Sequence, residues 1–179
     1  MTAKPFSQKK PSSNTLLLLQ QSFKSLEELL KRISMEKWPV KPRDGGWSIS
    51  EVVHHLVSVE VQGLQKLKDI VEGRQESAVV DSANRPEPAR LQNPRPKYKT
   101  ISEYEPTTGI PAKYLLDGLR RARSETIAYA QKVGRQQLSK IGIHTPWLNA
   151  VNGKEFLECL AYHTERHTAQ IARVIDPPQ

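Results

Sequence analysis

Apolar residues repeat at spacings of three and four in four separate stretches of the chain, which is the period that places side chains along one face of an α-helix. The first stretch spans residues 14–33, with Asn14 as its expected N-cap. The others span residues 48–73, 110–133 and 153–175, and glycine or proline lies at the end of each. The pattern predicts an all-α fold, an up-down four-helix bundle.

The second helix has a clear start signal. Ser48 precedes its first apolar positions and Glu51 follows three residues later. This spacing is typical of a capping box, in which the serine hydroxyl and the glutamate carboxylate each accept a hydrogen bond from a backbone N–H at the helix start. We therefore expect the second helix to begin directly after Ser48.

A long proline-rich connection, residues 73–110, separates the second and third helices. Its prolines are Pro86, Pro88, Pro94, Pro96 and Pro106, and it has few apolar residues. This composition argues against a regular helix. A connection of this length is commonly either functional or disordered, and the sequence leaves both alternatives open. Residues 1–13 are expected to form a flexible tail, and residues 14–176 one domain.

The chain of 179 residues has the usual length of one domain and can bury a core without disulfides. Its longest apolar run, Leu16 to Leu19, is far shorter than the roughly 20 residues of a membrane span, and the pattern of a secretory signal is absent. The single cysteine, Cys159, cannot form an internal disulfide, and nothing near it marks a nucleophile. We expect a cytoplasmic protein with Cys159 as a small core residue.

The net charge of +8 would suit an anionic partner such as a nucleic acid. Many of the basic residues lie in the expected tail and in the proline-rich connection, and no motif that reads nucleic acid accompanies them. These residues are Lys4, Lys9, Lys10, Arg85, Arg90, Arg95, Lys97 and Lys99. The charge is therefore expected to be spread over mobile segments, and nucleic-acid binding is not expected.

Two histidines of the fourth helix, His163 and His167, lie four residues apart and share a face. They lie with Gln170 in an arc of roughly 80° that also carries Phe156 and Leu160, so they are expected to point into the bundle. Burying two imidazoles costs free energy unless each has a partner, and a divalent metal ion would take a lone pair from each neutral ring. The alternative is a pair of histidines with ordinary hydrogen bonds.

The second helix offers a third ligand. His55 lies on the same side as Val52 and Val59, whereas the neighbouring His54 is turned about 100° toward the polar side. We therefore expect His55 to bind the metal together with the two histidines of the fourth helix. His54 is expected to be a solvated surface residue.

Three histidines match the ligand count of a catalytic metal site, in which at least one coordination position stays open. His144 could supply a fourth ligand, but its place beside Pro146 and Trp147 is more typical of packing or hydrogen bonding. Imidazole ligands suit zinc or nickel better than calcium or magnesium. The pattern therefore predicts one zinc or nickel ion.

Two motifs resemble those of the DinB and YfiT-like superfamily, in its DinB-like branch. They are W-S-I-S-E-V-V-H-H-L, which contains His55, and H-T-E-R-H-T-A-Q-I, which contains His163 and His167. The resemblance covers residues 16–174 except for the proline-rich connection, which departs from the family pattern and prevents details of substrate access from being carried over. It implies a four-helix bundle whose three histidines bind nickel or zinc.

Members of this superfamily include thiol transferases that use bacillithiol and isomerases that use mycothiol. The resemblance thus implies a small-molecule substrate, with a low-molecular-weight thiol as one candidate. A metal held by neutral imidazoles lowers the pKa of a bound water or thiol, so it would suit thiol transfer to a small electrophile or hydrolysis. The alternative is a helical bundle that binds metal or a partner without turnover.

Two polar residues are candidates for supporting the ligands. Glu51 precedes His55 by one helical turn, so it could accept a hydrogen bond from a ligand or carry a proton as a catalytic residue, or it could only complete the capping box. Gln170 shares the face of the fourth-helix histidines. Glu60 lies off the direction of His55, and Glu165 is expected at the surface.

A homodimer is also expected. Leu17 and Leu18 lie outside the main apolar stripe of the first helix, where they could form an interface or be covered by the N-terminal tail. The family resemblance points the same way, because relatives often pair through faces of the bundle.

Overall fold

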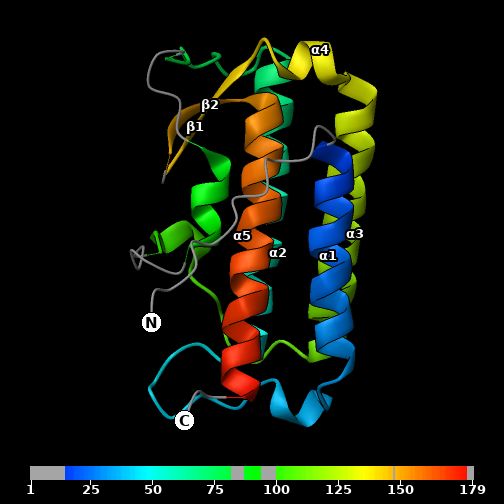
Figure 1. Cartoon of the computed structure of the whole chain (residues 1–179), viewed down its shortest axis with the longest axis vertical. Helices are drawn as coiled ribbons and strands as arrows, with labels where there is room; N and C mark the ends of the chain where they lie inside the picture. Colours follow the sequence, from blue (N-terminus) through cyan, green and yellow to red (C-terminus); the bar gives the residue numbers. More distant parts are fainter. Residues whose placement is uncertain (1–14, 82–86, 94–99, 147, 177–179) are drawn as a thin grey trace, which may run out of the picture.

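Four long helices form a bundle in the computed structural model, which describes residues 15–81, 87–93, 100–146 and 148–176 (Figure 1). They are α1 (Thr15–Lys31), α2 (Ile49–Val71), α3 (Ala112–Val133) and α5 (Gly153–Ile175). Each lies in one of the four stretches with helical periodicity, so the predicted four-helix bundle is confirmed. The expected tail and the expected N-cap Asn14 lie outside the described residues.

The helices do not alternate in direction as the up-down prediction required. Two contacts show that α2 and α3 run parallel. Glu60 in the middle of α2 binds Arg123 in the middle of α3, and Glu72, just past the end of α2, accepts a hydrogen bond from Tyr129 near the end of α3. α1 and α5 run in the opposite direction (Figure 1). The up-down prediction was wrong because the connection between α2 and α3 runs the length of the bundle and returns the chain to the end at which α2 begins.

This connection lies between Val71 and Ala112. Its described parts contain two short 3₁₀ helices, η2 (Pro88–Gln92) and η3 (Ser102–Tyr104). The first packs against α5, where its Leu91 is buried, and the second packs against α2. The described parts of the connection therefore cover the bundle on the side of α2 and α5.

A short helix and a β-hairpin join α3 to α5. The helix is α4 (Arg135–Leu138), and the antiparallel strands are β1 (Gly142–Thr145) and β2 (Asn149–Asn152). Ile143 pairs with Val151, and both side chains are fully buried. These strands were not predicted from the sequence, because four-residue strands are too short to show a reliable alternating pattern.

The core extends along the whole bundle in two clusters of buried residues. One surrounds α5 near the hairpin, and Cys159 belongs to it, which confirms its prediction as a core residue. The other lies near the opposite end and includes the fully buried Trp38. Of the two leucines expected outside the main stripe of α1, Leu18 packs against the first cluster and Leu17 is 39% exposed. The homodimer stays a prediction.

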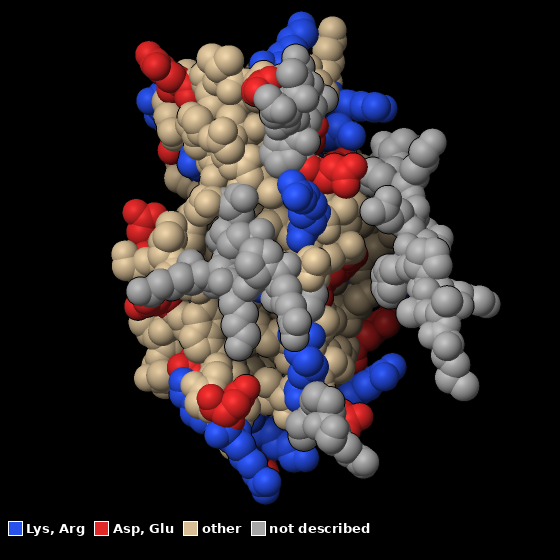
Figure 2. Space-filling view, turned by 60° about the vertical axis from the view of Figure 1, so that its left-hand side comes forward, with Lys and Arg blue, Asp and Glu red and all other residues tan. Residues whose placement is uncertain are grey.

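Basic and acidic side chains are interspersed over the face seen in Figure 2. Of the eight basic residues assigned to the tail and the connection, all but Arg90 lie outside the described residues. Within the described ranges, no helix is both long and apolar enough to cross a membrane.

Candidate metal centre

The start of α2 is set by the predicted capping box. The Ser48 hydroxyl accepts a hydrogen bond from the Glu51 backbone N–H at 3.3 Å, and the Glu51 carboxylate accepts one from the Ser48 backbone N–H at 2.7 Å. These bonds satisfy amide groups that the first turn of a helix leaves without partners. The capping box therefore fixes where α2 begins and which way His55, one turn later, points.

α5 begins with a second capping box. Asn152 accepts from the Glu155 backbone N–H, and Glu155 accepts from the Asn152 backbone N–H, both at 2.9 Å. This capping box was not predicted, although an asparagine followed three residues later by a glutamate is a recognisable signal of a helix start. α2 approaches α5 closely at Gly63, where a Cβ atom would lie 3.2 Å from Phe156. The two helices that carry the candidate ligands are thus anchored at their starts and held close together.

The three predicted imidazoles converge between α2 and α5. Nε2 of His163 lies 3.3 Å from Nε2 of His55 and 3.1 Å from Nε2 of His167. All three side chains are buried, and each offers a ligand atom within 4.8 Å of the other two. Among the histidines, cysteines and carboxylates of the described ranges, these three form the group that could hold a metal ion.

The outer ring nitrogens of two histidines face carbonyl oxygens. Nδ1 of His55 lies 2.8 Å from the main-chain oxygen of Tyr104, and Nδ1 of His167 lies 2.7 Å from Oε1 of Gln170. A carbonyl oxygen only accepts hydrogen bonds, so both Nδ1 atoms carry the proton and both Nε2 atoms present lone pairs to the centre. Gln170 lies where it was predicted. Tyr104 was missed, because a main-chain carbonyl has no signature in a sequence.

The surroundings keep the three rings neutral. Burial is the main reason that the pKa of His163 lies well below its ordinary value, and the neighbouring His167 and His55 lower it further. Burial also lowers the pKa of His167 to about 3. The pKa of His55 is lowered by burial too, although the bond to Tyr104 partly opposes this. Neutral imidazole is the form that binds a metal.

The donor set fits one divalent ion. Zinc–imidazole bonds of about 2.0–2.1 Å in a tetrahedral site place neighbouring nitrogens about 3.3 Å apart. The Nε2–Nε2 distances from His163 to His55 and His167, 3.3 and 3.1 Å, are close to this nitrogen–nitrogen distance. The Nε2 lone pairs of His55 and His167 both face Nε2 of His163, so one divalent cation between the three rings would bind all of them at once.

Two aromatic residues flank the histidines. The Trp47 ring stacks on His167 with an interplanar angle of 16° and a centroid separation of 6.4 Å, and it lies 5.0 Å from the His55 ring. Tyr104 meets His55 edge-on at 6.5 Å. These rings give the centre apolar walls, which strengthen electrostatic interactions inside it.

Glu51 is committed to the start of α2. Besides Ser48, its carboxylate accepts a hydrogen bond from Lys41 at 2.7 Å. Burial raises the pKa of Glu51, but the bonds from Lys41 and Ser48 lower it by more, so the pKa lies below the ordinary value. The described contacts thus favour the capping role of Glu51 over a role beside the ligands. The ligands His55 and His167 instead donate hydrogen bonds to the carbonyl oxygens of Tyr104 and Gln170.

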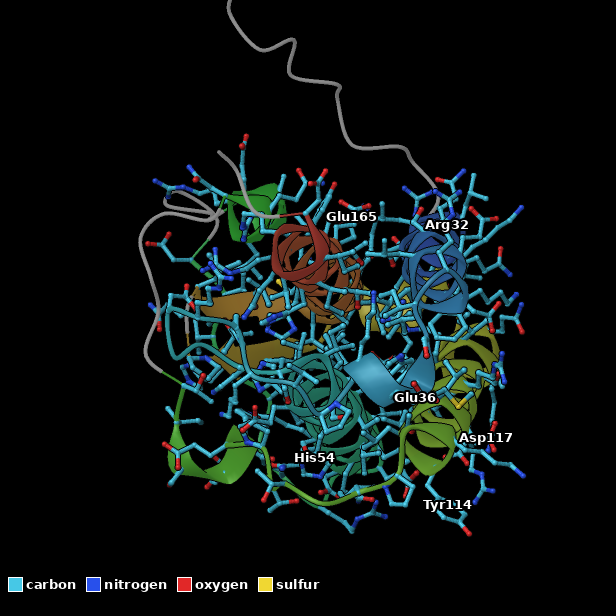
Figure 3. The ribbon with its side chains drawn as sticks, turned by 90° about the horizontal axis from the view of Figure 1, so that it is seen from below. Arg32, Glu36, His54, Tyr114, Asp117 and Glu165 are labelled. Carbon is cyan, nitrogen blue, oxygen red and sulfur yellow. The ribbon has the colours of Figure 1, made fainter. Side chains whose placement is uncertain are left out.

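The remaining candidates are outside the group of three histidines. Glu60 is buried in a pair with Arg123, and Glu165 lies on the outer side of α5 (Figure 3). His144 is exposed on β1. His54 was expected to be solvated, but it is half-buried and its Nδ1 accepts a hydrogen bond from the backbone of the segment leading into α3. The expectation was wrong because that segment lies over the polar side of α2 and partly covers His54.

The chain is similar to known proteins in sequence and in fold. The family model for the DinB superfamily matches residues 18–171. The uncharacterized protein YuaE of Bacillus subtilis is 26% identical over 150 residues, which covers 81% of this chain and 87% of YuaE. The solved structure of Bacillus subtilis YfiT is described as a probable metal-dependent hydrolase with an unusual four-helix bundle topology. It matches with a TM-score of 0.62 and 18% identity over 97% of this chain and 91% of YfiT.

Proposed function

The chain belongs to the DinB superfamily, and on that premise we propose that it is a metal-dependent hydrolase acting on a small molecule at His55, His163 and His167. The observation that carries the proposal is that the Nε2 atoms of three neutral imidazole rings lie close together between α2 and α5. The choice of hydrolysis is supported by the likeness to YfiT, which is described as a probable metal-dependent hydrolase.

Each residue of the site has a distinct task in this proposal. The three histidines would hold one zinc or nickel ion, and a tetrahedral ion with three protein ligands keeps a position for water or substrate. When bound, the ion would lower the pKa of a water molecule and polarise a substrate oxygen. Tyr104 and Gln170 hold two rings in the tautomer that presents Nε2.

Two alternative functions would use the same three histidines. Thiol transfer to a small electrophile would rely on the same ability of the ion to lower a pKa, here that of a thiol substrate. A bundle that binds metal without turnover would have the same ligands and no reaction. Both alternatives are distinguished from hydrolysis by measuring products as well as metal content.

The test uses protein purified without a histidine tag or chelator and then loaded with zinc or nickel. We expect hydrolysis of at least one member of a panel of chromogenic esters, amides and phosphoesters. His163→Ala should abolish it, as should a chelator. His144→Ala is the matched control, because His144 is exposed on β1 and lies outside the cluster.

Three results would contradict the proposal. Hydrolysis that persists in His163→Ala would place the reaction elsewhere. Consumption of a low-molecular-weight thiol together with an electrophile such as chlorodinitrobenzene, without hydrolysis of the panel, would establish thiol transfer instead. A stoichiometric metal ion without either reaction would favour the non-catalytic bundle.

A further inference from the structure

We infer that His54 and Gln62, two side chains of α2 outside the ligand set, are positioning residues for the metal centre. They hold residues 103–107, here called the strap, against α2. The strap in turn presents the Tyr104 carbonyl to His55. The inference rests on the metal site of the proposed function but not on the reaction.

The strap meets α2 through its main chain. Nε2 of Gln62 donates a hydrogen bond to the Glu103 carbonyl at 3.0 Å, and the backbone N–H of Thr107 donates one to Nδ1 of His54 at 3.0 Å. The bond from His55 to the Tyr104 carbonyl lies between these two along the strap. Side chains of α2 thus bind the strap on both sides of the carbonyl that orients the ligand.

The neighbouring residues His54 and His55 use Nδ1 in opposite senses. His54 accepts there from a backbone N–H, so its Nδ1 keeps the lone pair. His55 donates there to a backbone oxygen, so its lone pair is on Nε2. The two adjacent rings, about 100° apart around the helix, therefore have separate tasks, one toward the strap and one toward the metal. Figure 3 shows His54 on the side of α2 that lies beside the segment leading into α3.

The strap has little regular secondary structure of its own. η3 ends at Tyr104, and from Glu105 to Pro111 the chain has neither helix nor strand. The Tyr104 carbonyl is therefore not held by the hydrogen-bond ladder of a long helix or a sheet. The ring of Tyr104 packs beside the core, and the Glu105 N–H donates to the Ser102 carbonyl within η3, so the contacts with α2 supplement a single short turn in directing the Tyr104 carbonyl.

Loss of a strap contact has a specific consequence for His55. When the Tyr104 carbonyl moves away, the proton of a neutral His55 is free to occupy Nε2, and an Nε2–H ring cannot bind a metal through that atom. Losing a hydrogen-bond partner that orients a metal ligand typically costs 10–100-fold in metal affinity. We expect losses of about this size from either positioning residue.

The experiment compares His54→Ala and Gln62→Ala with Gln65→Ala, all as full-length proteins whose fold is checked by circular dichroism. Gln65 is the matched control, because it lies on α2 and its amide binds Asp69 instead of the strap. Zinc affinity is measured by competition with a chromophoric chelator, and the site geometry by the absorption bands of bound cobalt. His54→Asn retains a side-chain acceptor and should recover affinity relative to His54→Ala.

A second readout needs no metal. ¹⁵N NMR of the metal-free protein reports the tautomer of His55, which should be Nδ1–H in the wild type and in Gln65→Ala. In His54→Ala and Gln62→Ala we expect a mixture of tautomers. This measurement remains decisive for the strap whatever the affinity of the site for zinc.

Unchanged zinc affinity, cobalt spectra and His55 tautomer in both His54→Ala and Gln62→Ala would overturn the inference. A wild-type protein that binds neither zinc nor nickel would instead overturn the metal centre and the proposed function. A protein that binds zinc and shows the expected strap effects, but hydrolyses nothing, would overturn the proposed reaction alone.

Discussion

The guanidinium of Arg123 on α3 binds the carboxylate of Glu60 on α2 through two hydrogen bonds of 2.9 Å in the buried interior of the bundle. Arg123 also donates to the main-chain oxygen of Leu19 on α1 and to the hydroxyl of Thr164 on α5. One side chain thus connects the four long helices. Thr164 directly follows the candidate ligand His163 in the sequence of α5, so this network holds α5 at the residue next to a ligand.

Glu60→Ala is expected to lower the free energy of unfolding by about 3–5 kcal/mol, because it leaves the charge of Arg123 buried without its partner. Urea denaturation followed by circular dichroism measures this loss. Glu28→Ala is the control, since Glu28 pairs with Lys24 at 3.9 Å on the exposed surface and should cost at most about 1 kcal/mol. Equal losses in the two variants would contradict the prediction.

Metal-free protein is expected to take up about one zinc or nickel ion per chain, because three neutral imidazoles suit these ions. Isothermal titration measures the stoichiometry and affinity. His55→Ala and His167→Ala should each weaken binding strongly, whereas His144→Ala should bind like the wild type. Absence of uptake by the wild type, or loss of uptake only in His144→Ala, would show that the ligands are assigned wrongly.

The metal-free protein is expected to lose stability as the pH falls below about 6.5, the ordinary pKa of histidine. Burial lowers the pKa of His167 to about 3 in the folded chain and also lowers those of His163 and His55. Below about pH 6.5 the unfolded chain therefore binds protons that the folded chain does not, and the free energy of unfolding decreases. At pH 5 each ring that stays neutral in the folded chain lowers the free energy of unfolding by about 2 kcal/mol relative to pH 7.

This pH dependence is measured by urea unfolding of chelator-treated protein at pH 7 and pH 5. His167→Gln removes one of the titrating rings, so its stability should change less between these two pH values than that of the wild type. His144→Ala keeps all three buried rings and should behave like the wild type. Identical pH dependence in His167→Gln and the wild type would contradict the prediction.

Gly63 is expected to reject larger side chains, because its Cβ would lie 3.2 Å from Phe156 and 3.4 Å from Leu160. Gly63→Val should cost about 1–3 kcal/mol by overpacking, and it should weaken metal binding by separating α2 from α5. Gly118 on α3 has only ordinary contacts, at 3.8 Å with Val57, so Gly118→Ala should stabilise the helix by up to about 1 kcal/mol. Thermal unfolding measures the stability of both variants. A Gly63→Val protein as stable as the wild type would contradict the close packing of α2 against α5 at this position.

Cys159 is expected to react slowly with thiol reagents in the folded protein. Its side chain is 4% exposed, and burial raises its pKa, with further contributions from the nearby Glu158 and Glu155. Thiolate is the reactive form, so both effects suppress the reaction. Reaction with Ellman's reagent should be slow in buffer and fast in urea. A fast reaction of the folded protein would place the thiol at the surface.

The sequence by itself determined the four helices and the directions of the three histidines. Periodicity, the capping box of Ser48 and Glu51, and the angle of about 100° per residue are local properties, so they can be read without knowing the partners of a helix. The choice of His55 over His54 followed from this phase alone. The convergence of His55 with His163 and His167 then required only that the apolar stripes of α2 and α5 face each other.

Only the tertiary structure decided the order of helix directions, the pairing of Glu60 with Arg123, and the acceptor of His55. A long connection can return the chain to either end of a bundle, so its sequence does not reveal whether α3 runs parallel to α2. Every residue has a main-chain carbonyl, so nothing in the sequence distinguishes that of Tyr104. Such features depend on contacts between residues far apart in the chain, and they exist only once the helices and the connection are packed together.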